Sequence, residues 1–316
     1  MIVEHRSIIV VVLTALTMIG VAAGIKLAQL EEMQKSAENN HSQIEVSPSL
    51  TPDKGFLIKE SPKTGNVSGT PVVSNTVPSD GISAEAYIVG DVETGRIFLE
   101  KRPDKILPFA SMSKLITALI ATNIYNSTTT ITITPEEVNV PADGSGIRAG
   151  ESFTVKELLY PLLLNSSNIA GEALASSTDR AYFLKLMSDY SWEMGMPESS
   201  LADPTGLSPM NSGTARGFFG MAQYLYRVRP DILAITRIAS SSVATTTDHG
   251  PHIFSSIHPF VNDPRFVGGK TGHTNEALDT MLTIMKIDDR PIAFIVLRSQ
   301  NRARDTRLLI EKFGSI

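Results

Sequence analysis

Ser111-Met112-Ser113-Lys114-Leu115-Ile116 opens the segment of sequence that decides the fold, and this segment runs to Ile124. Its apolar residues recur at intervals of three and four, which predicts a helix buried on one face. They are Met112, Leu115, Ile116, Leu119, Ile120 and Ile124. Serine is a good N-cap, so we expect the helix to begin near Ser111 and to hold that residue at its positive end.

Strand patterns occur on both sides of this helix. Two apolar runs, 86–89 and 97–99, flank the turn-like Glu93-Thr94-Gly95 and predict a hairpin. A second hairpin is predicted late in the chain, with strands at 278–287 and 291–297. The first and last parts of the globular region are therefore expected to contribute strands.

Helical patterns fill the middle of the chain and its end. The capping box Thr154-Val155-Lys156-Glu157 predicts a helix start, and further helices are predicted over 181–194, 214–228 and 303–313. Strands at both ends with helices between them predict an α+β fold. In this fold an antiparallel sheet is flanked by helices, with a helical subdomain beside it.

The composition excludes several classes of protein. The 316 residues are 42% hydrophobic and 19% charged, which is typical of a globular protein. The net charge of −5 supplies no basic surface for phosphates, so we expect no nucleic-acid partner. The absence of cysteine excludes disulfides, thiolate metal sites and a cysteine nucleophile.

The first thirty residues predict a membrane segment. Residues 8–25 carry no charge and would span about 27 Å as a helix, close to the thickness of a bilayer core. We interpret residues 1–30 as a single-pass membrane anchor, with cleavage as a signal peptide near Val21-Ala22-Ala23 as the alternative. Polar residues 31–81 predict a disordered linker. The globular domain, residues 82–316, would then lie outside the cytoplasm.

Ser111 and Lys114 form the first motif that could carry chemistry. They are three residues apart, so a helix places both side chains on one face. Serine becomes an effective nucleophile when a base takes its proton, and lysine can be that base if burial or a neighbouring cation lowers its pKa. The alternative is a capping serine followed by a solvated lysine. Lys114 lies in an apolar helix, where a lysine without a role is less expected.

Two further motifs follow later in the chain. Ser166-Ser167-Asn168 has the composition of a helix cap, and a second Ser-x-Asn occurs at 299–301. Lys270-Thr271-Gly272 can lie on a strand, where Gly272 would allow a substrate backbone to approach closely. Lys270 would then face an anionic substrate. The same tripeptide at 63–65 lies in the polar linker, and we interpret that copy as a coincidence.

In this order the three motifs resemble those of the penicillin-recognising serine acyl enzymes. Longer strings resemble the D-alanyl-D-alanine carboxypeptidases, the low-molecular-mass penicillin-binding proteins. The strings are Pro108-Phe109-Ala110-Ser111-Met112-Ser113-Lys114-Leu115, Asp203-Pro204-Thr205-Gly206-Leu207 and Lys270-Thr271-Gly272-His273-Thr274-Asn275-Glu276-Ala277. The resemblance covers about 82–316 and implies an α/β sandwich-like domain of the β-lactamase/transpeptidase type.

The resemblance implies a role for each motif residue. Ser111 would be the acylated nucleophile, Lys114 its base, kept neutral by Lys270, and Ser166 a proton relay to the leaving amine. The substrate-binding residues would be Asn168 for an amide, Lys270 and Thr271 for the terminal carboxylate, Gly272 in the same motif, and His273, whose N–H would form an oxyanion hole with that of Ser111. Neither a cofactor nor a metal is implied.

The implied reaction is the release of terminal D-alanine from peptidoglycan stem peptides, with β-lactams acylating the same serine. Two features depart from the family pattern. Ser167 stands where many relatives have glycine, which is expected to narrow the site. Many carboxypeptidases of this family also have a β-rich C-terminal domain and a C-terminal membrane helix, which we do not expect here because Ile316 comes soon after the last predicted helix. Shorter relatives include DD-endopeptidases, which cut cross-links. Endopeptidase activity therefore stays open as an alternative.

Three other functions remain as alternatives. A class A β-lactamase would need a deacylating glutamate, and Glu198 lies in a carboxypeptidase-like stretch instead. A metallopeptidase would use His249, His252 and His258, but His249-Gly250-Pro251-His252 cannot form the helix that such a motif requires. A penicillin or cell-wall sensor would become acylated without turnover, and the sequence does not exclude it.

Overall fold

The computed structural model describes residues 81–316. The predicted anchor, residues 1–30, lies outside the described residues, as does the predicted linker up to residue 80. Among the described helices, none is both long and apolar enough to cross a membrane. The predicted membrane segment therefore stays a prediction from sequence.

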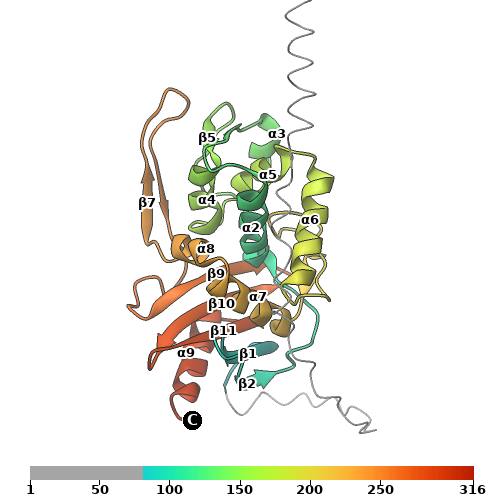
Figure 1. Cartoon of the computed structure of the whole chain (residues 1–316), viewed down its shortest axis with the longest axis vertical. Helices are drawn as coiled ribbons and strands as arrows, with labels where there is room; N and C mark the ends of the chain where they lie inside the picture. The colour runs from blue at the N-terminus through green and yellow to red at the C-terminus, as the bar shows by residue number, and fades with distance from the viewer. Residues whose placement is uncertain (1–80) are drawn as a thin grey trace, which may run out of the picture. The chain divides into compact units, whose positions relative to one another are not determined.

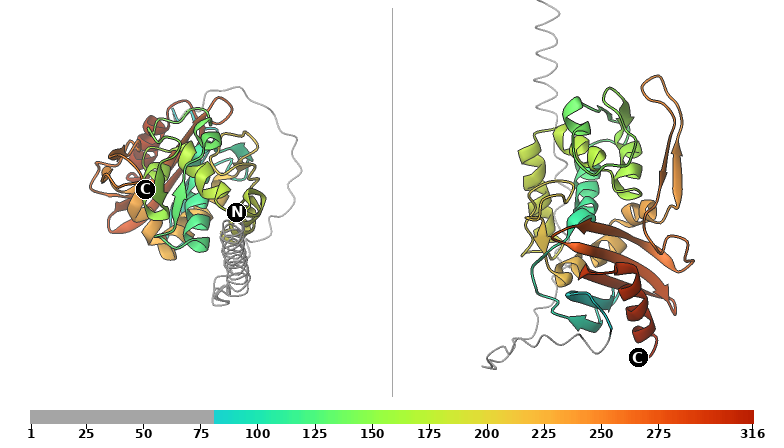
Figure 2. Two further views of the ribbon diagram at one scale, coloured as in Figure 1. Left: turned by 90° about the horizontal axis from the view of Figure 1, so that it is seen from above. Right: turned by 180° about the vertical axis from the view of Figure 1, so that it is seen from behind.

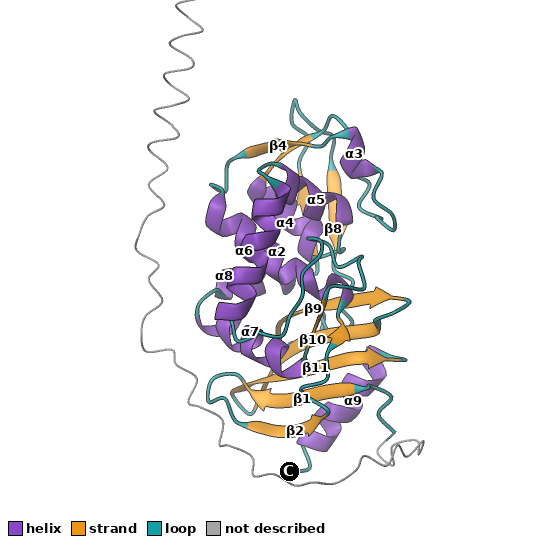
Figure 3. Ribbon diagram, turned by 90° about the vertical axis from the view of Figure 1, so that its right-hand side faces the viewer, coloured by secondary structure: helices purple, strands orange, loops and turns teal. Residues whose placement is uncertain are grey.

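Five antiparallel strands form the main sheet, in the order β2-β1-β11-β10-β9 (Figures 1 and 3). The strands are β1 Ala86–Asp91, β2 Ile97–Lys101, β9 Phe266–Thr274, β10 Leu278–Ile287 and β11 Arg290–Ser299. Both predicted hairpins, β1–β2 and β10–β11, are confirmed. Ala86 pairs with Leu297, so the sheet joins the two ends of the domain, as the sequence predicts.

Both faces of this sheet are covered by helices. On β11, Phe294 and Val296 pack in the cluster that includes α9, Arg302–Phe313, while Ala293 and Ile295 pack in the larger cluster with the other helices (Figure 2). Successive side chains of a strand point to opposite faces. Because both faces of β11 are buried, it is a continuous apolar run instead of an alternating one.

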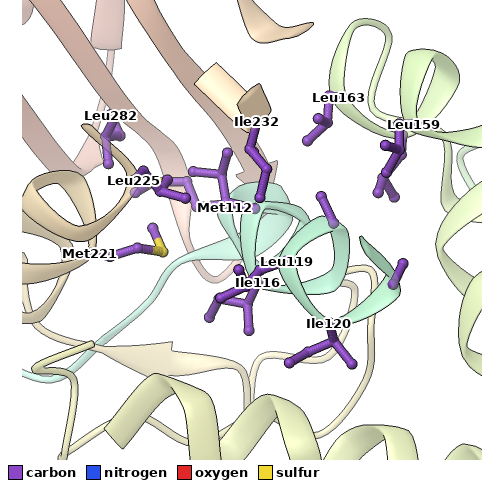
Figure 4. Close-up of a cluster of buried hydrophobic side chains, with 14 of the residues drawn as sticks. Met112, Ile116, Leu119, Ile120, Leu159, Leu163, Met221, Leu225, Ile232 and Leu282 are labelled. Carbon is purple, nitrogen blue, oxygen red and sulfur yellow. The ribbon is translucent and has the colours of Figure 1, made fainter. Parts of the chain in front are cut away.

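Helix α2, Lys114–Ile124, lies at the centre of the helical part (Figure 4). Its apolar side chains pack among residues of α4, α7, α8 and β10. Every residue from Lys114 to Ala121 is buried, so the expectation of a single buried face was wrong. Neighbouring elements also pack against the other face of the helix, because its residues Thr117 and Ala118 are small. Thr117, for example, donates a hydrogen bond to the Pro204 carbonyl.

The remaining helices surround α2 or join it to the sheet. They are α3 Pro135–Val138, α4 Val155–Leu163, α5 Asn168–Ser176, α6 Arg180–Glu193, α7 Ala215–Arg227 and α8 Pro230–Thr236. The predicted capping box is present at α4, where Thr154 and Glu157 accept hydrogen bonds from each other's backbone N–H. The bounds of α6 and α7 agree with the sequence prediction within one residue.

Three small two-stranded sheets were not predicted. They are β3 Leu107–Pro108 with β6 Ser212–Gly213, β4 Thr130–Thr132 with β5 Ser152–Thr154, and β7 Ser240–Val243 with β8 His252–Ser255. Strands of two to four residues are too short to show a period in the sequence.

The start of α2 differs from the prediction. Residues Ala110–Ser113 form a 3₁₀ turn, η1, and the α-helix begins at Lys114. Neither η1 nor α2 has a side-chain N-cap, so Ser111 is not the predicted cap. Its hydroxyl is therefore not committed to the backbone of the helix. The interval of three residues still brings it to Lys114.

Turn η1 is shaped by a chain crossing that requires glycine. Ala110 has a φ of +50° and Gly206 a φ of +85°. A Cβ on Gly206 would lie 2.0 Å from the Ala110 carbonyl oxygen and 2.7 Å from the Ser113 hydroxyl oxygen. No side chain fits in that space. The loop that contains Gly206 consequently fixes the backbone immediately before Ser111.

We predict that Gly206→Ala displaces η1 and lowers stability, together with the acylation of Ser111 that the family resemblance implies. The matched control is Gly150→Ala, since Gly150 also has a φ of +85° but nothing within 4 Å of its Cβ position. Backbone strain should cost each variant about 1–2 kcal/mol, and only Gly206→Ala adds the clash. Thermal unfolding and labelling with fluorescent penicillin measure the two effects. Equal losses in the two variants would contradict the proposed crossing constraint.

Candidate active site

Three distant segments meet at one place in the structure. Ser111 lies in η1, Lys114 begins α2, Ser166 lies just before α5, and Lys270 lies in β9. The segment containing Ser166 joins the other two, because Lys270 contacts Ser166 and Lys114 contacts Asn168. The three sequence motifs therefore form a single cluster.

Lys114 is buried and has three oxygen neighbours. Its Nζ lies 2.8 Å from Ser111 Oγ, 2.7 Å from Asn168 Oδ1 and 2.6 Å from the Thr205 carbonyl oxygen. Its exposed fraction is 0%. The two carbonyl oxygens can only accept hydrogen bonds. Of these three neighbours, Ser111 alone can donate a proton to a neutral amine.

Burial lowers the pKa of Lys114 to about 7, the charges of Asp203, Asp143 and Glu172 opposing that shift. The family resemblance implies that Lys270 keeps Lys114 neutral. The structure instead makes burial the principal cause, because transfer from water disfavours the charged form. At neutral pH a large fraction of Lys114 is consequently the free amine.

Lys270 lies in β9, as predicted for its motif, and 1% of it is exposed. Its Nζ donates to Ser166 Oγ at 2.9 Å and to the Thr271 carbonyl oxygen at 3.0 Å. Burial, then the charges of Lys114 and Arg302, push the pKa of Lys270 well below its usual value. Ser166 has a φ of +67°, a backbone conformation that is uncommon for serine. It is held by the lysine it contacts.

The side-chain amide of Asn168 makes hydrogen bonds within the protein through both its oxygen and its nitrogen. Its Oδ1 accepts from Lys114, while its Nδ2 donates to the carbonyl oxygens of Pro141 at 3.0 Å and Ala142 at 3.3 Å. Asn168 is 4% exposed. This geometry differs from the substrate-amide role that the resemblance implies, because both amide hydrogens are already used within the protein.

Ser167 does not narrow the site in the way its size suggested. Its hydroxyl accepts from the Ala170 N–H at 3.1 Å as the N-cap of α5, and it donates to Asp143 Oδ2 at 2.7 Å. The residue is 1% exposed. Its side chain is therefore part of the support of the site, and the cap interpretation of this motif applies to Ser167.

Gly272 serves a close contact with η1. A Cβ on Gly272 would lie 2.5 Å from Thr280 Oγ1, 2.8 Å from the Phe109 carbonyl oxygen and 3.0 Å from the Ala110 Cβ. The expected reason for glycine, access for a substrate backbone, is thus replaced by the approach of β9 to the turn that carries Ser111. Thr271, next to it, is 2% exposed.

His273 directly follows the third motif and contacts an acidic residue. Its Nδ1 lies 2.9 Å from Asp279 Oδ1, and its side chain is 61% exposed. Arg302 donates to the same Asp279 oxygen at 3.2 Å and to the Gly272 carbonyl oxygen at 2.7 Å. This end of β9 therefore carries a second cation beside Lys270.

Four residues of the site were missed as site residues by reasoning from sequence. They are Asp143, Asp203, Thr205 and Arg302. Thr205 acts through its backbone carbonyl oxygen, and no sequence pattern predicts such a contact, although residues 203–207 carry part of the family resemblance. The Asp203 carboxylate shapes that loop by accepting from the backbone N–H groups of Thr205 and Gly206. The short Asp143-Gly144-Ser145 turn is a recognisable signal, but nothing in the sequence points it towards Asn168.

The rings of His249 and His252 lie 5.9 Å apart, but each of the three histidines considered for a metal site has other contacts. His249 stacks on Phe153, His252 contacts Glu151 at 3.0 Å, and His258 accepts from the Phe260 N–H and contacts the Leu282 carbonyl oxygen. Burial lowers the pKa of His258 to about 3, so it is neutral. Within residues 81–316 there is no group of three histidine or acidic residues placed to hold a metal ion.

Two of the motifs occur a second time in the sequence, at 299–301 and at 63–65. In Ser299-Gln300-Asn301, Asn301 caps α9 and Ser299 donates to the buried carboxylate of Asp305, far from Lys114 in sequence and with no contact to it. The earlier Lys63-Thr64-Gly65 lies outside the described residues. The choice of 166–168 as the second motif is consistent with its contacts to both lysines.

Comparison with known proteins agrees with this arrangement. The family model for peptidase S11, D-alanyl-D-alanine carboxypeptidase, matches residues 73–301. The chain belongs to this family. As a peptidase S11 member it is a serine DD-peptidase that acts on peptidoglycan, which confirms the resemblance inferred from the three motifs.

Curated relatives in peptidase S11 carry two activities in their names. A D-alanyl-D-alanine endopeptidase of Haemophilus influenzae is 26% identical over 242 residues, covering 73% of this chain and 82% of the relative. A D-alanyl-D-alanine carboxypeptidase of Mycobacterium tuberculosis is 25% identical over 213 residues, covering 66% of this chain and 72% of the relative. The chain is thus similar to proteins named for each of the two activities.

Solved structures confirm the predicted fold class for this S11 domain. A putative penicillin-binding protein homologue from Mycobacterium tuberculosis superposes with a TM-score of 0.70 at 21% identity, covering 77% of this chain and 95% of that one. Penicillin-binding protein D2 of Listeria monocytogenes, solved with cefotaxime bound, gives 0.63 at 25% identity, with coverages of 73% and 96%.

The buried lysine predicts the pH dependence of acylation. If Lys114 is the base for Ser111, its neutral form accepts the proton, and this form predominates above its pKa. The rate of acylation of Ser111 should then rise with pH through about 7 and level off. Fluorescent penicillin labelling at a series of pH values measures this rate. Lys114→Ala should abolish labelling, whereas the exposed Lys156→Ala should not change it. A rate independent of pH from 5 to 9 would contradict this assignment.

Proposed function

We propose that the chain is a serine-type D-alanyl-D-alanine carboxypeptidase that trims peptidoglycan stem peptides through an acyl-enzyme on Ser111. The observation that carries this proposal is the buried Lys114 amine, 2.8 Å from Ser111 Oγ and with a pKa near 7. A serine hydroxyl needs such a base to attack a peptide carbonyl. Family membership supplies the substrate class.

The proton of Ser111 has one path in this geometry. A neutral amine has two hydrogens and one lone pair. Lys114 uses its hydrogens towards Asn168 Oδ1 and the Thr205 carbonyl oxygen, which leaves its lone pair for the hydroxyl of Ser111. The attack of Ser111 on the substrate carbonyl then transfers the hydroxyl proton to Lys114.

Ser166 and Lys270 support the second half of the acylation step. Ser166 Oγ accepts from Lys270 and faces the cluster from the segment next to Asn168. The proton that Lys114 took from Ser111 would return to the leaving amine of D-alanine, with the Ser166 hydroxyl as the relay. Lys270 and Thr271 of β9 and the adjacent Arg302 of α9 form a polar, cationic region, and we place the terminal carboxylate of the substrate there. The charge of that region is complementary to a carboxylate.

Hydrolysis of the acyl-enzyme would then complete the reaction. Ser111 Oγ bonds to the penultimate D-alanyl carbonyl carbon, the bond to the terminal D-alanine breaks, and water later releases the shortened peptide. The backbone N–H groups of Ser111 and His273 would stabilise the oxyanion, an interaction that is typically worth about 10² to 10³ in rate per donor. β-Lactams would acylate Ser111 by the same attack and leave slowly.

A second candidate is DD-endopeptidase activity on cross-linked peptides. It is favoured by the Haemophilus influenzae relative, which is an endopeptidase aligned over 82% of its length. The chemistry at Ser111 would be the same, and the leaving group would be larger. The two activities are therefore distinguished by substrate and not by the nucleophile.

We also propose that this activity takes place outside the cytoplasmic membrane, where peptidoglycan lies. The support is the uncharged sequence of residues 8–25, which is long enough to anchor the chain. Membrane fractionation of the full chain tests this placement. Recovery of the untruncated chain in the cytosolic fraction would contradict it.

The deciding experiment combines product release with labelling. The full chain should release D-alanine from a D-Ala-D-Ala pentapeptide faster than it cleaves a cross-linked peptide dimer, and fluorescent penicillin should label it. Ser111→Ala should lose both signals. Ser113→Ala is the matched control in the same turn, because its buried hydroxyl has no hydrogen-bond partner within the described structure.

Each other outcome identifies a different function. Preferential cleavage of the dimer would replace the proposal by endopeptidase activity, and labelling without release of D-alanine would indicate a sensor. Rapid nitrocefin turnover would indicate a β-lactamase, for which Glu198 is poorly suited because it is exposed. The absence of both labelling and D-alanine release would refute an active Ser111.

A further inference from the structure

A carboxylate outside the three motifs supports the segment that joins them. Asp143 lies in the loop between α3 and β5, and it accepts hydrogen bonds from two residues that flank Asn168. Its Oδ2 lies 2.7 Å from Ser167 Oγ and 2.9 Å from the Ile169 N–H. Its Oδ1 accepts from the N–H and hydroxyl of Ser145. Both carboxylate oxygens are thus fully used within the protein.

The same loop binds Asn168 from its other side. The carbonyl oxygens of Pro141 and Ala142 accept from Asn168 Nδ2, and Ala142 has a φ of +55°. Together with the two bonds to Asp143, four hydrogen bonds join residues 141–143 to residues 167–169. The loop therefore fixes both the backbone and the amide orientation of the second motif.

This attachment determines where the two lysine contacts lie. Ser166, which contacts Lys270, has the left-handed φ of +67° and has no helical hydrogen bond of its own to hold it. Asn168, which contacts Lys114, begins α5. Because Asp143 holds the residues on both sides of Asn168, a loss of its bonds would release the strained turn and move both contacts.

The charge of Asp143 also acts on Lys114. Burial opposes ionisation of Asp143, but hydrogen bonds from Ser145, Ile169 and Ser167 outweigh it and lower its pKa, so the carboxylate stays ionised. Asp143 is one of three acids that face Lys114, beside Asp203 from the loop after α6 and Glu172 from α5. From the opposite side, β9 brings Lys270. Negative charge near the amine favours its protonated form.

We propose that Asp143 is a positioning residue of the active site, which holds the Ser166–Asn168 turn against the two lysines and presents a buried negative charge to Lys114. This inference rests on the proposed acylation of Ser111, since acylation is the reaction in which it would be observed. Asp143 itself touches neither the substrate nor the reacting atoms.

Two variants separate the two parts of this role. Asp143→Asn removes the charge, so the neutral form of Lys114 should persist to lower pH, and the midpoint of the pH profile of acylation should fall by about half a unit or more. Displacement of the turn should also reduce the plateau rate, roughly 10-fold or more. Ser167→Ala removes two hydrogen bonds, the one to Asp143 and the N-cap bond from the Ala170 N–H, but keeps the charge. It should lower the plateau and leave the midpoint in place.

The test measures fluorescent penicillin acylation of the full chain from pH 5 to 9, with Asp189→Asn on the surface of α6 as the control. Thermal unfolding confirms that each variant is folded. A lower midpoint in Asp143→Asn, with an unchanged midpoint in Ser167→Ala, is the expected result. A general loss of structure would lower rates without moving the midpoint downward.

Two results overturn the inference. One is a wild-type midpoint and plateau in folded Asp143→Asn. The other is an unchanged plateau in Ser167→Ala, which decides the question even if Asp143→Asn does not fold. Failure of the wild-type chain to become acylated at any pH would be different, because it would refute the proposed function of Ser111 before the role of Asp143 is reached.

Discussion

The burial of one amine is the constraint on which the rest of the site depends. Lys114 gains its reactivity from being withdrawn from water, and a buried lysine is costly unless its hydrogens find acceptors. The fold supplies them from two distant segments, Asn168 and the carbonyl of Thr205. Three acids at a greater distance limit the shift that burial causes. The amine is therefore neutral enough to accept a proton and still well enough bonded to stay in place.

The position of the serine follows from a second constraint, the contact of two backbones. η1 is pressed between the loop that contains Gly206 and the strand that contains Gly272. Neither neighbour has room for a Cβ. Ala110 adopts a left-handed conformation between them, and Ser111 follows it. A 3₁₀ turn held in this way fixes Ser111, the proposed nucleophile, more firmly than a free loop does, because its backbone has little space in which to move.

Much of the fold could be predicted from sequence because period and capping are local properties. The strands of both hairpins and helices α6 and α7 have such signals, and they were found. The interval between Ser111 and Lys114 also predicted their contact. The surroundings of α2 could not be predicted in the same way, because Thr117 and Ala118 do not look like buried positions until their neighbours are known. The acceptor from Thr205 and the support from Asp143 depend on loops meeting in space, which no single segment encodes.

The pairing of Ala86 with Leu297 also affects how the protein folds during its synthesis. A ribosome makes about two hundred intervening residues before β11 exists, and closing so long a loop is slow and entropically expensive. Until β11 is made, β1 has no partner on that side, and β10 lacks one of its two neighbours. β9 then has no complete sheet behind it to carry Lys270 to Ser166. We therefore expect the contact between Lys270 and Ser166 to form only after β11 has been made and has paired with β1.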